Sequence, residues 1–463
     1  MRSGVSKAGA WVHRAILIGG DAVILLGAFQ LGLEYWMRKV GPNAGEFYPA
    51  AIICLVAYLM TLSMFDLYDI QRNYRSQQAS TLTHILGAVV MAGVGLSGLF
   101  YVMPDVKLPR GSFFIQMGLA IPLLYLWRVN FARLRQEMLI PKRVLVVGTG
   151  EDGQTALDLL KRSGTEYHVV GFIDDNPDRQ TRTIGGYAVL GGADALPSLV
   201  KEHDVQGIIM AIAKAEGERL IRATLQCRMK GVFVSDLITV SEQVAGKILL
   251  KHVRDSWFVY APGFLLLHHR MYRRIKRITD VACAGIGLVL ASPLLVLAGI
   301  LVAAESPGPL FYRQTRVGQN EVLFSALKFR TMKWGDETQS PYTAKNDPRV
   351  TLMGMVLRFL RIDEIPQMWN VLTGEMSFIG PRAEWDILVK EYKEKIPYYS
   401  LRHVVKPGIT GWAQVNYPYG SSVEDAYKKL EYDLYYVKNM SFALDLRILL
   451  KTVSVVLMGK GAL

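Results

Sequence analysis

The sequence predicts a membrane protein of three parts. These are a bundle of four transmembrane helices over residues 1–138, an α/β Rossmann-like domain over 139–262, and a mixed α/β domain with a re-entrant membrane helix over 263–463. Four apolar segments open the chain, a strand with a glycine-rich loop and a helix follows, and a proline interrupts a fifth apolar segment. At 463 residues the chain is too long for one ordinary domain, and 51% hydrophobic residues are typical of a membrane protein with sizeable soluble parts.

The four apolar segments, near 16–33, 48–65, 85–103 and 113–129, each approach the roughly 20 residues that a helix needs to cross a bilayer. Cations precede the first segment and follow the fourth, so both flanks are expected in the cytoplasm. These cations are Arg2, Lys7, Arg14, Arg128, Arg133, Arg135, Lys142 and Arg143. Asp21 lies within the first segment, and we expect it to face the bundle interior, paired or protonated, rather than to serve a function.

The formal net charge of +13 is compatible with nucleic acid, an anionic membrane surface or an anionic substrate as partner. The cations cluster beside apolar segments, at 128–143 and 270–277, which favours lipid headgroups, and no nucleic-acid-binding motif is recognisable. Because of this charge placement and the lack of such a motif, no nucleic-acid partner is expected.

The three cysteines are too far apart for zinc spacing or a disulfide framework.

The middle domain begins with a strand at 143–147, a glycine-rich loop and a helix at 154–162. The loop glycines are Gly148, Gly150 and Gly153, and a second strand at 169–173 ends in Asp174. This order is typical of dinucleotide-binding folds, in which a helix N-terminus holds phosphate. Two interpretations stay open: the loop and Asp174 bind a nucleotide, or the glycines only form a tight turn in an inherited fold.

The fifth apolar segment, 279–304, is long enough to cross a membrane, yet basic residues flank both of its ends. The positive-inside rule then places both ends in the cytoplasm. Pro293 interrupts the helical hydrogen bonds near the middle, and Ser292 can satisfy a carbonyl that the proline leaves free. A kinked spanning helix is the alternative, but we expect a re-entrant helix that enters and leaves by the same leaflet.

Adjacent carboxylates, Asp363 and Glu364, stand just before Pro366. Asp is a favoured N-cap residue, and proline is tolerated in a first helical turn, so the pair is expected at the positive end of a helix dipole, which favours ionised carboxylates. An ionised Asp can attack phosphorus, and a neighbouring carboxylate can hold Mg²⁺. An ordinary capped helix is the alternative interpretation.

Cations near this pair favour a phosphate site. Arg358 and Arg361 precede it by one turn or less, and Gly380-Pro381-Arg382 follows as a rigid turn that ends in a guanidinium. Two further cations, Lys328 and Arg330, lie in Lys328-Phe-Arg-Thr-Met332.

These motifs resemble those of the bacterial monotopic phosphoglycosyl transferases, the sugar transferases that act on polyprenyl phosphate. The matching stretches, in chain order, are Ser292-Pro293, Lys328-Phe-Arg-Thr-Met332, Ile362-Asp-Glu364, Gly374-Glu-Met-Ser-Phe-Ile-Gly-Pro-Arg382, Lys406-Pro-Gly-Ile-Thr-Gly-Trp-Ala-Gln-Val-Asn416 and Tyr432-Asp-Leu-Tyr-Tyr-Val-Lys-Asn439. The preceding spans and middle domain are similar to the large, multi-domain form of the family. This chain has Pro381-Arg382-Ala383 where the family pattern has Pro-Arg-Pro, which puts the rigidity of the turn in doubt.

The resemblance implies the following chemistry. Asp363 would attack the β-phosphate of a UDP-sugar, release UMP and form a covalent phosphosugar intermediate, from which undecaprenyl phosphate would take the sugar phosphate. Glu364 would bind Mg²⁺, and the phosphates or the nucleotide would be bound by Lys328, Arg330, Arg358, Arg382 and Asp433. The enzyme would be a homodimer in the bacterial inner membrane with its soluble domains in the cytoplasm, and would initiate exopolysaccharide, capsule or O-antigen synthesis. Which sugar it transfers stays open, and so does the role of Arg361.

Two other functions are weighed against this one. A membrane-anchored, NAD-dependent sugar-nucleotide epimerase or dehydratase would use the glycine-rich loop, but its catalytic Tyr-x-x-x-Lys is matched only by Tyr272-Arg-Arg-Ile-Lys276, beside the membrane segment. A non-enzymatic assembly scaffold would need no carboxylate pair among arginines.

Overall fold

A computed structural model describes residues 4–40, 47–65, 67–68, 78–103, 108–138, 141–163, 167–180, 182–212, 218–261, 264, 270–334, 349–418, 420 and 422–457. The flanking cation Arg2 lies outside these residues. The chain divides into two compact units, Met1–Ala245 and Gly246–Leu463.

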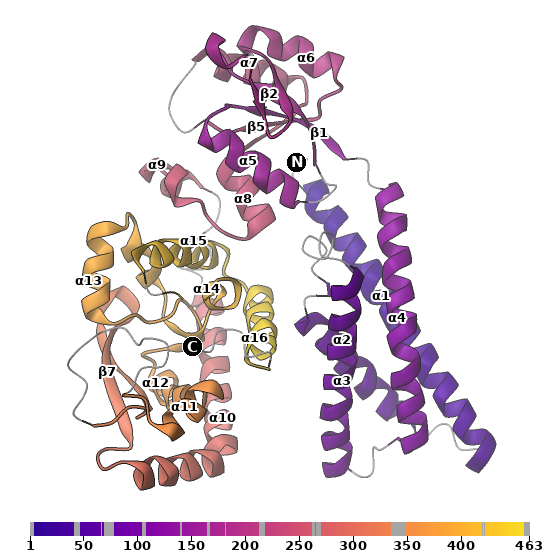
Figure 1. Cartoon of the computed structure of the whole chain (residues 1–463), viewed down its shortest axis with the longest axis vertical. Coiled ribbons are helices and arrows are strands. Elements are labelled where there is room, and N and C mark those ends of the chain that lie inside the picture. Colours follow the sequence, from indigo (N-terminus) through magenta and orange to yellow (C-terminus); the bar gives the residue numbers. More distant parts are fainter. Residues whose placement is uncertain are drawn as a thin grey trace. The chain divides into compact units, whose positions relative to one another are not determined.

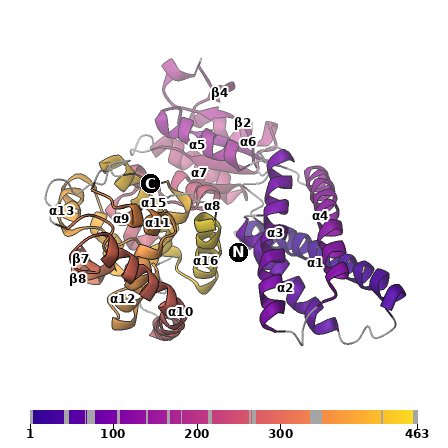
Figure 2. The same cartoon turned by 60° about the horizontal axis from the view of Figure 1, so that its bottom comes forward.

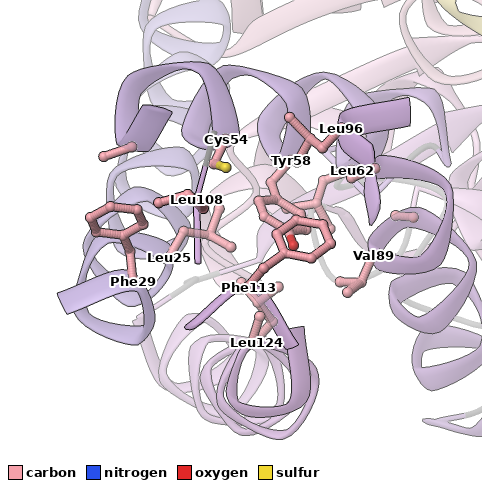
Figure 3. Packing of buried hydrophobic residues seen from close by; sticks show 14 of the residues in the cluster. Leu25, Phe29, Cys54, Tyr58, Leu62, Val89, Leu96, Leu108, Phe113 and Leu124 are labelled. Carbon is pink, nitrogen blue, oxygen red and sulfur yellow. The ribbon is translucent and has the colours of Figure 1, made fainter. Parts of the chain in front are cut away.

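Four apolar helices form the N-terminal bundle (Figure 1). They are α1 (Gly4–Val40), α2 (Tyr48–Met64), α3 (Gln78–Val102) and α4 (Arg110–Met138). Leu25, Tyr58, Val89 and Phe113, one from each helix, lie in one buried cluster (Figure 3). Among the described residues, α1, α3, α4 and the later helix α10 are long and apolar enough to cross a membrane, whereas α2 is shorter.

A buried ion pair joins the first and last helices of this bundle. Asp21 of α1 is fully buried, and a guanidinium nitrogen of Arg128 on α4 lies 2.5 Å from its carboxylate. Arg128 also donates to the carbonyl of Leu67. The expectation that Asp21 is paired in the interior is confirmed. The prediction that Arg128 is a flanking cation is wrong, because its charge is buried against Asp21.

The middle domain is a six-stranded sheet in the order β3-β4-β2-β1-β5-β6, parallel except for the β3–β4 hairpin. Its strands are β1 (Lys142–Val147), β2 (Tyr167–Ile173), β3 (Thr183–Ile184), β4 (Tyr187–Gly191), β5 (Gly207–Met210) and β6 (Phe233–Asp236). Helices α6 (Leu196–Glu202) and α7 (Glu218–Met229) cover one face, and α5 (Glu151–Arg162) and α8 (Leu237–Ala245) cover the other (Figure 1). The predicted strands and the helix after the glycine-rich loop are confirmed.

The second unit combines helices with two small sheets. Its helices are α9 (Asp255–Tyr260), α10 (Arg270–Glu305), α11 (Leu352–Phe359), α12 (Met368–Thr373), α13 (Asp386–Lys395), α14 (Trp412–Asn416), α15 (Val423–Asn439) and α16 (Phe442–Leu457). An antiparallel hairpin joins β7 (Phe311–Val317) to β8 (Leu323–Phe329), and β9 (Ser377–Ile379) pairs in parallel with β10 (Gly408–Thr410).

This unit begins earlier than the predicted boundary at residue 263. Lys247 lies 2.6 Å from the carboxylate of Glu431 on α15, and the Trp412 indole donates to the carbonyl of Gly246. The segment after α8 therefore packs with the C-terminal unit.

Helix α10 bends along its length and lies beside α12 (Figures 1 and 2). Pro293 lies inside it, and its missing N–H would leave the carbonyl of Val289 without a helical partner. The Ser292 hydroxyl donates to that carbonyl at 2.7 Å, as the sequence predicts. Both halves of α10 contact the same unit: Ala284 packs with Val371 of α12, and the later half packs on β8 and α11.

Candidate active site

The two carboxylates lie in a 3₁₀ helix, Ile362–Gln367, between α11 and α12. Arg361 precedes it in the left-handed conformation (φ 58°), which non-glycine residues rarely adopt. This reversal turns the chain sharply after α11. Asp363 occupies the second position of the 3₁₀ helix, so the prediction that it is an N-cap is wrong; the N-cap is Arg361.

Glu364 is held by arginines. The Arg382 guanidinium donates to its Oε1 at 2.6 Å, and Arg361 lies 4.0 Å from Oε2. Burial opposes the negative charge, but Arg382, together with Arg361 and Arg316, lowers the pKa of Glu364 to about 2. Glu364 is therefore ionised at neutral pH and fixed in place.

Asp363 has a different environment. Its side chain is 8% exposed, and burial, with the neighbouring charge of Glu364, raises its pKa to about 6 although Lys328, Arg358 and Arg361 oppose the shift. The prediction that a helix dipole favours the ionised form is wrong for Asp363, because burial and the neighbouring carboxylate outweigh it. Within the described part of the chain, Asp363 Oδ1 is buried without a hydrogen-bond partner. One carboxylate oxygen thus makes no hydrogen bond within the described residues.

Lys328 on β8 and Arg316 on β7 bring positive charge to the pair. Burial and the like charge of Arg316 lower the pKa of Lys328 to about 7. Arg316 donates to the Ala383 carbonyl at 2.7 Å, next to Arg382. The sequence analysis does not single out Arg316 as a site residue, and its place near the end of β7 gives no signal of a site.

The two remaining predicted cations, Arg358 and Arg330, lie in different surroundings. Arg358 donates from Nε to the Thr331 hydroxyl at 2.9 Å and lowers the pKa of Asp363. Arg330 is buried, and its guanidinium donates to the carbonyls of Ser306 and Pro307, just after α10. Arg330 therefore braces the end of α10, and the structure does not bring it to the carboxylate pair.

Asp433 reaches the site through Arg402, a residue that sequence reasoning missed. Arg402 is buried, binds Asp433 at 2.8 Å and donates to the backbone carbonyl of Arg382 at 2.8 Å. Arg382 in turn holds Glu364. Asp433 thus affects the carboxylate pair indirectly, through Arg402 and Arg382. The only sequence signal for Arg402 is its position shortly before the motif that begins at Lys406.

The glycine-rich loop of the middle domain is built as predicted, but its acidic residue is engaged. Gly148 (φ 108°) and Gly153 lie so close to backbone that a Cβ atom would clash, whereas Gly150, at the start of α5, faces open space. Both oxygens of Asp174 accept hydrogen bonds, one from the amide and hydroxyl of Thr149 and the other from the Asn176 amide. These bonds and Arg179 lower its pKa although burial opposes the shift. Asp174 therefore stabilises the loop.

A metal ion has few ligands at the carboxylate pair. Among the described residues, no group of three or more His, Cys, Asp or Glu side chains could hold a metal. Mg²⁺ commonly binds one or two carboxylates and completes its shell with water and substrate phosphates. Glu364 fits that arrangement as one such carboxylate, because its Oε2 lies 4.0 Å from Arg361, beyond hydrogen-bonding distance.

Two known families match parts of the chain. The family described as "Bacterial sugar transferase" matches residues 271–459, and "CoA-binding domain" matches residues 63–235. UDP-N-acetylgalactosamine-undecaprenyl-phosphate N-acetylgalactosaminephosphotransferase of Aeromonas hydrophila is 31% identical over 460 residues, which cover 98% of each chain.

Two UDP-glucose:undecaprenyl-phosphate glucose-1-phosphate transferases are also similar. The enzyme of Escherichia coli is 42% identical over 193 residues, or 41% of this chain and 42% of that one. The enzyme of Xanthomonas campestris is 29% identical over 453 residues, or 90% of both chains.

The site and the similarity together define a membrane-associated phosphotransferase. Because the Aeromonas relative aligns along nearly the whole chain, this protein belongs to the family of bacterial polyprenyl-phosphate sugar-1-phosphate transferases. The epimerase and scaffold alternatives are set aside. Tyr272 is buried and, like Lys276, bonds Asp445, and both residues belong to a different unit from the glycine-rich loop.

Proposed function

We propose that this enzyme transfers a sugar phosphate from a UDP-sugar to undecaprenyl phosphate through a covalent intermediate on Asp363, as the first step in the synthesis of a surface glycan. The observation that carries the proposal is the contrast within the pair: Glu364 is ionised and bound by Arg382, while Asp363 has an unengaged oxygen. Neighbouring carboxylates whose pKa values are pushed apart take different roles in a reaction.

In the first step, an Asp363 carboxylate oxygen attacks the sugar-bearing phosphorus of the UDP-sugar. The bond from that phosphorus to the bridging oxygen breaks, and UMP leaves with the electron pair. In the second step, a phosphate oxygen of undecaprenyl phosphate attacks the same phosphorus, and the bond to Asp363 breaks. The products are UMP and a diphosphate-linked lipid sugar, and the Asp363 carboxylate is restored without net proton transfer.

The cations stabilise negative charge along this path. Arg358 and Lys328 act electrostatically on Asp363, and Arg382 binds Glu364, so the transferred and departing oxygens would meet positive charge. Phosphoryl transfer depends mainly on positioning and charge neutralisation. Glu364 is proposed to hold Mg²⁺, which when bound would offset charge on the diphosphate.

We further propose that α10 is re-entrant, so that the soluble domains stay on the cytoplasmic side of the inner membrane. The bend and the Ser292–Val289 hydrogen bond support this, and so does the packing of both halves of α10 on one unit. A homodimer also remains a proposal, which the mass of the detergent-solubilised enzyme would test.

The donor sugar is proposed from the relatives. The relative that aligns over the whole chain is named for N-acetylgalactosamine, and two others are named for glucose. UDP-N-acetylgalactosamine and UDP-glucose are therefore the first donors to test.

Intact-protein mass spectrometry tests the covalent step. The purified enzyme is incubated with each UDP-sugar and Mg²⁺ without lipid, then analysed. We expect an added mass of one sugar phosphate with the correct donor, its disappearance on addition of undecaprenyl phosphate, and no adduct with Asp363→Ala. Lipid-dependent UMP release without an adduct in any rapid-quench sample would argue for direct transfer between the two substrates.

A further inference from the structure

A hollow of about 660 Å³ opens at the end of α10, beside the start of α11. It is lined by residues 305–308, 333–334 and 350–352. Its volume falls within the roughly 300–1,000 Å³ typical of small-molecule sites. None of its lining residues has a role in the reaction described above.

The walls of the hollow are held by specific contacts. Arg330 donates to the carbonyls of Ser306 and Pro307 at 2.6 and 2.7 Å. Gly308 has φ 123°, and a Cβ atom there would meet the Arg330 guanidinium and lie 3.1 Å from Trp334. A residue larger than glycine at position 308 would therefore have to displace Trp334. This close packing indicates that the cavity is preformed.

The lining suits a hydrocarbon chain better than a phosphate. Pro307, Trp334, Val350 and Leu352 supply apolar surface. The carboxylate of Glu305 accepts from the Met353 amide at 3.0 and 3.2 Å, at the start of α11, where the helix dipole offsets its charge. Lys333 also lines the hollow, and its positive charge is opposed by the negative charge of Glu305, so the lining offers an anion no net positive charge.

The hollow lies at the end of α10, and one of its lining residues is hydrogen-bonded towards the reaction site. The later half of α10 exposes Leu297, Ile300 and Leu301, which suits contact with lipid. On the other side, the amide of Thr351 in the lining donates to the Thr331 carbonyl.

Thr331 is also the link to the active site, because its hydroxyl accepts from Arg358 at 2.9 Å. Arg358 is one of the cations that act on Asp363. The hollow is thus separated from a proposed phosphate-binding cation by a single hydrogen-bonded pair of threonines.

We propose that this hollow binds the isoprene units next to the phosphate of the polyprenyl phosphate acceptor, while the phosphate itself reaches past Thr331 to Arg358. The inference rests on the proposed function. A membrane phospholipid chain could also fill an apolar hollow, but its phosphate is a diester and not a terminal monoester that could attack the phosphorus held at Asp363. Continuity with the active site therefore favours the acceptor.

The test separates the two half-reactions in Trp334→Ala. The first is followed as exchange of labelled UMP into UDP-sugar without lipid, and the second as transfer to undecaprenyl phosphate. We expect unchanged exchange and a rise in KM for the lipid on the order of tenfold, the effect of losing one well-packed aromatic contact. Trp369→Ala is the matched control, since Trp334 and Trp369 are 56% and 57% exposed but only Trp334 lines the hollow.

A short, water-soluble polyprenyl phosphate distinguishes acceptor binding from general membrane contact. If the hollow binds the first isoprene units, the Trp334→Ala defect persists with this acceptor. Loss of the defect with the short acceptor, or an equal defect in Trp369→Ala, would mean membrane or phospholipid contact and would overturn the proposal. An unchanged KM for the lipid in Trp334→Ala, or an equal fall in its UMP exchange, would also overturn it. Absence of exchange in the wild type would instead contradict the covalent step, and the KM comparison would still test the hollow.

Discussion

Two acidic motifs of this protein look equally suited to chemistry in the sequence but have opposite environments in the structure. Asp174 follows a strand and a glycine-rich loop, and both of its oxygens accept hydrogen bonds from neighbouring backbone or side-chain groups. Asp363 lies among cations, yet one of its oxygens has no partner in the described part of the chain. A saturated carboxylate stabilises its surroundings, whereas a buried, unsaturated one is available to react.

The largest expected effect is that of Asp363→Asn. The amide is nearly the same size as the carboxylate but is not a nucleophile, so UMP release should fall by about 10⁴-fold or more. Asp174→Asn serves as the control for expression and membrane insertion and should retain activity. Residual turnover within tenfold of wild type would remove Asp363 from the nucleophile role.

Arg382→Lys should have the next largest effect, a loss of roughly 10²–10³-fold in kcat/KM, because the guanidinium fixes Glu364 and, in the proposed reaction, would neutralise charge on the diphosphate. Steady-state kinetics with the best UDP-sugar would measure it. Arg361→Lys is a matched control, since Arg361 lies 4.0 Å from the same carboxylate and is more exposed. Equal losses in the two variants would show that proximity of charge, rather than the Arg382 geometry, is what matters.

The pH dependence of kcat/KM should be bell-shaped. Asp363 must be ionised to attack, so the rate should rise as pH passes its pKa of about 6. Lys328 must be protonated to stabilise phosphate charge, so the rate should fall as pH passes its pKa of about 7. Each limb changes the rate about tenfold per pH unit. In Lys328→Arg the upper limb should move to much higher pH, and an unmoved upper limb would assign that proton to another group.

The smallest effect concerns stability rather than catalysis. Asp174→Asn should weaken the bonds to Thr149 and destabilise the loop by about 1–3 kcal/mol, with sugar transfer unchanged. Faster hydrogen exchange of amides 148–153 would report this. Asp175→Asn keeps an amide oxygen that can accept from the Ala193 amide and only weakens that bond, so it should leave those amides protected. A large activity loss in Asp174→Asn would instead point to a functional link between the domains.

Much of the fold was predictable because it depends on local patterns. The apolar segments, the strand–loop–helix order of the middle domain and the role of Ser292 at Pro293 follow from periodicity, glycine geometry and the missing proline N–H. The residues gathered at the active site were mostly recognised by motif: Lys328, Arg358 and Arg382 all act on the carboxylate pair.

The motifs could not predict which hydrogen-bond or ion-pair partner each charged side chain has. Arg330 lies two residues after Lys328 yet binds the chain after α10. Arg128 pairs with Asp21 inside the bundle, and Arg402 connects Asp433 to Arg382. Each choice depends on residues far away in the sequence, which only the folded chain brings within hydrogen-bonding distance.

The sequence by itself determined the order of the three parts, the position of the helix break and the adjacency of Asp363 and Glu364, because these depend on neighbours along the chain. The tertiary structure alone decided that Asp363 is buried with an unengaged oxygen while Glu364 is ionised. Burial and distant arginines set those pKa values, and both are properties of the packed molecule rather than of any local pattern.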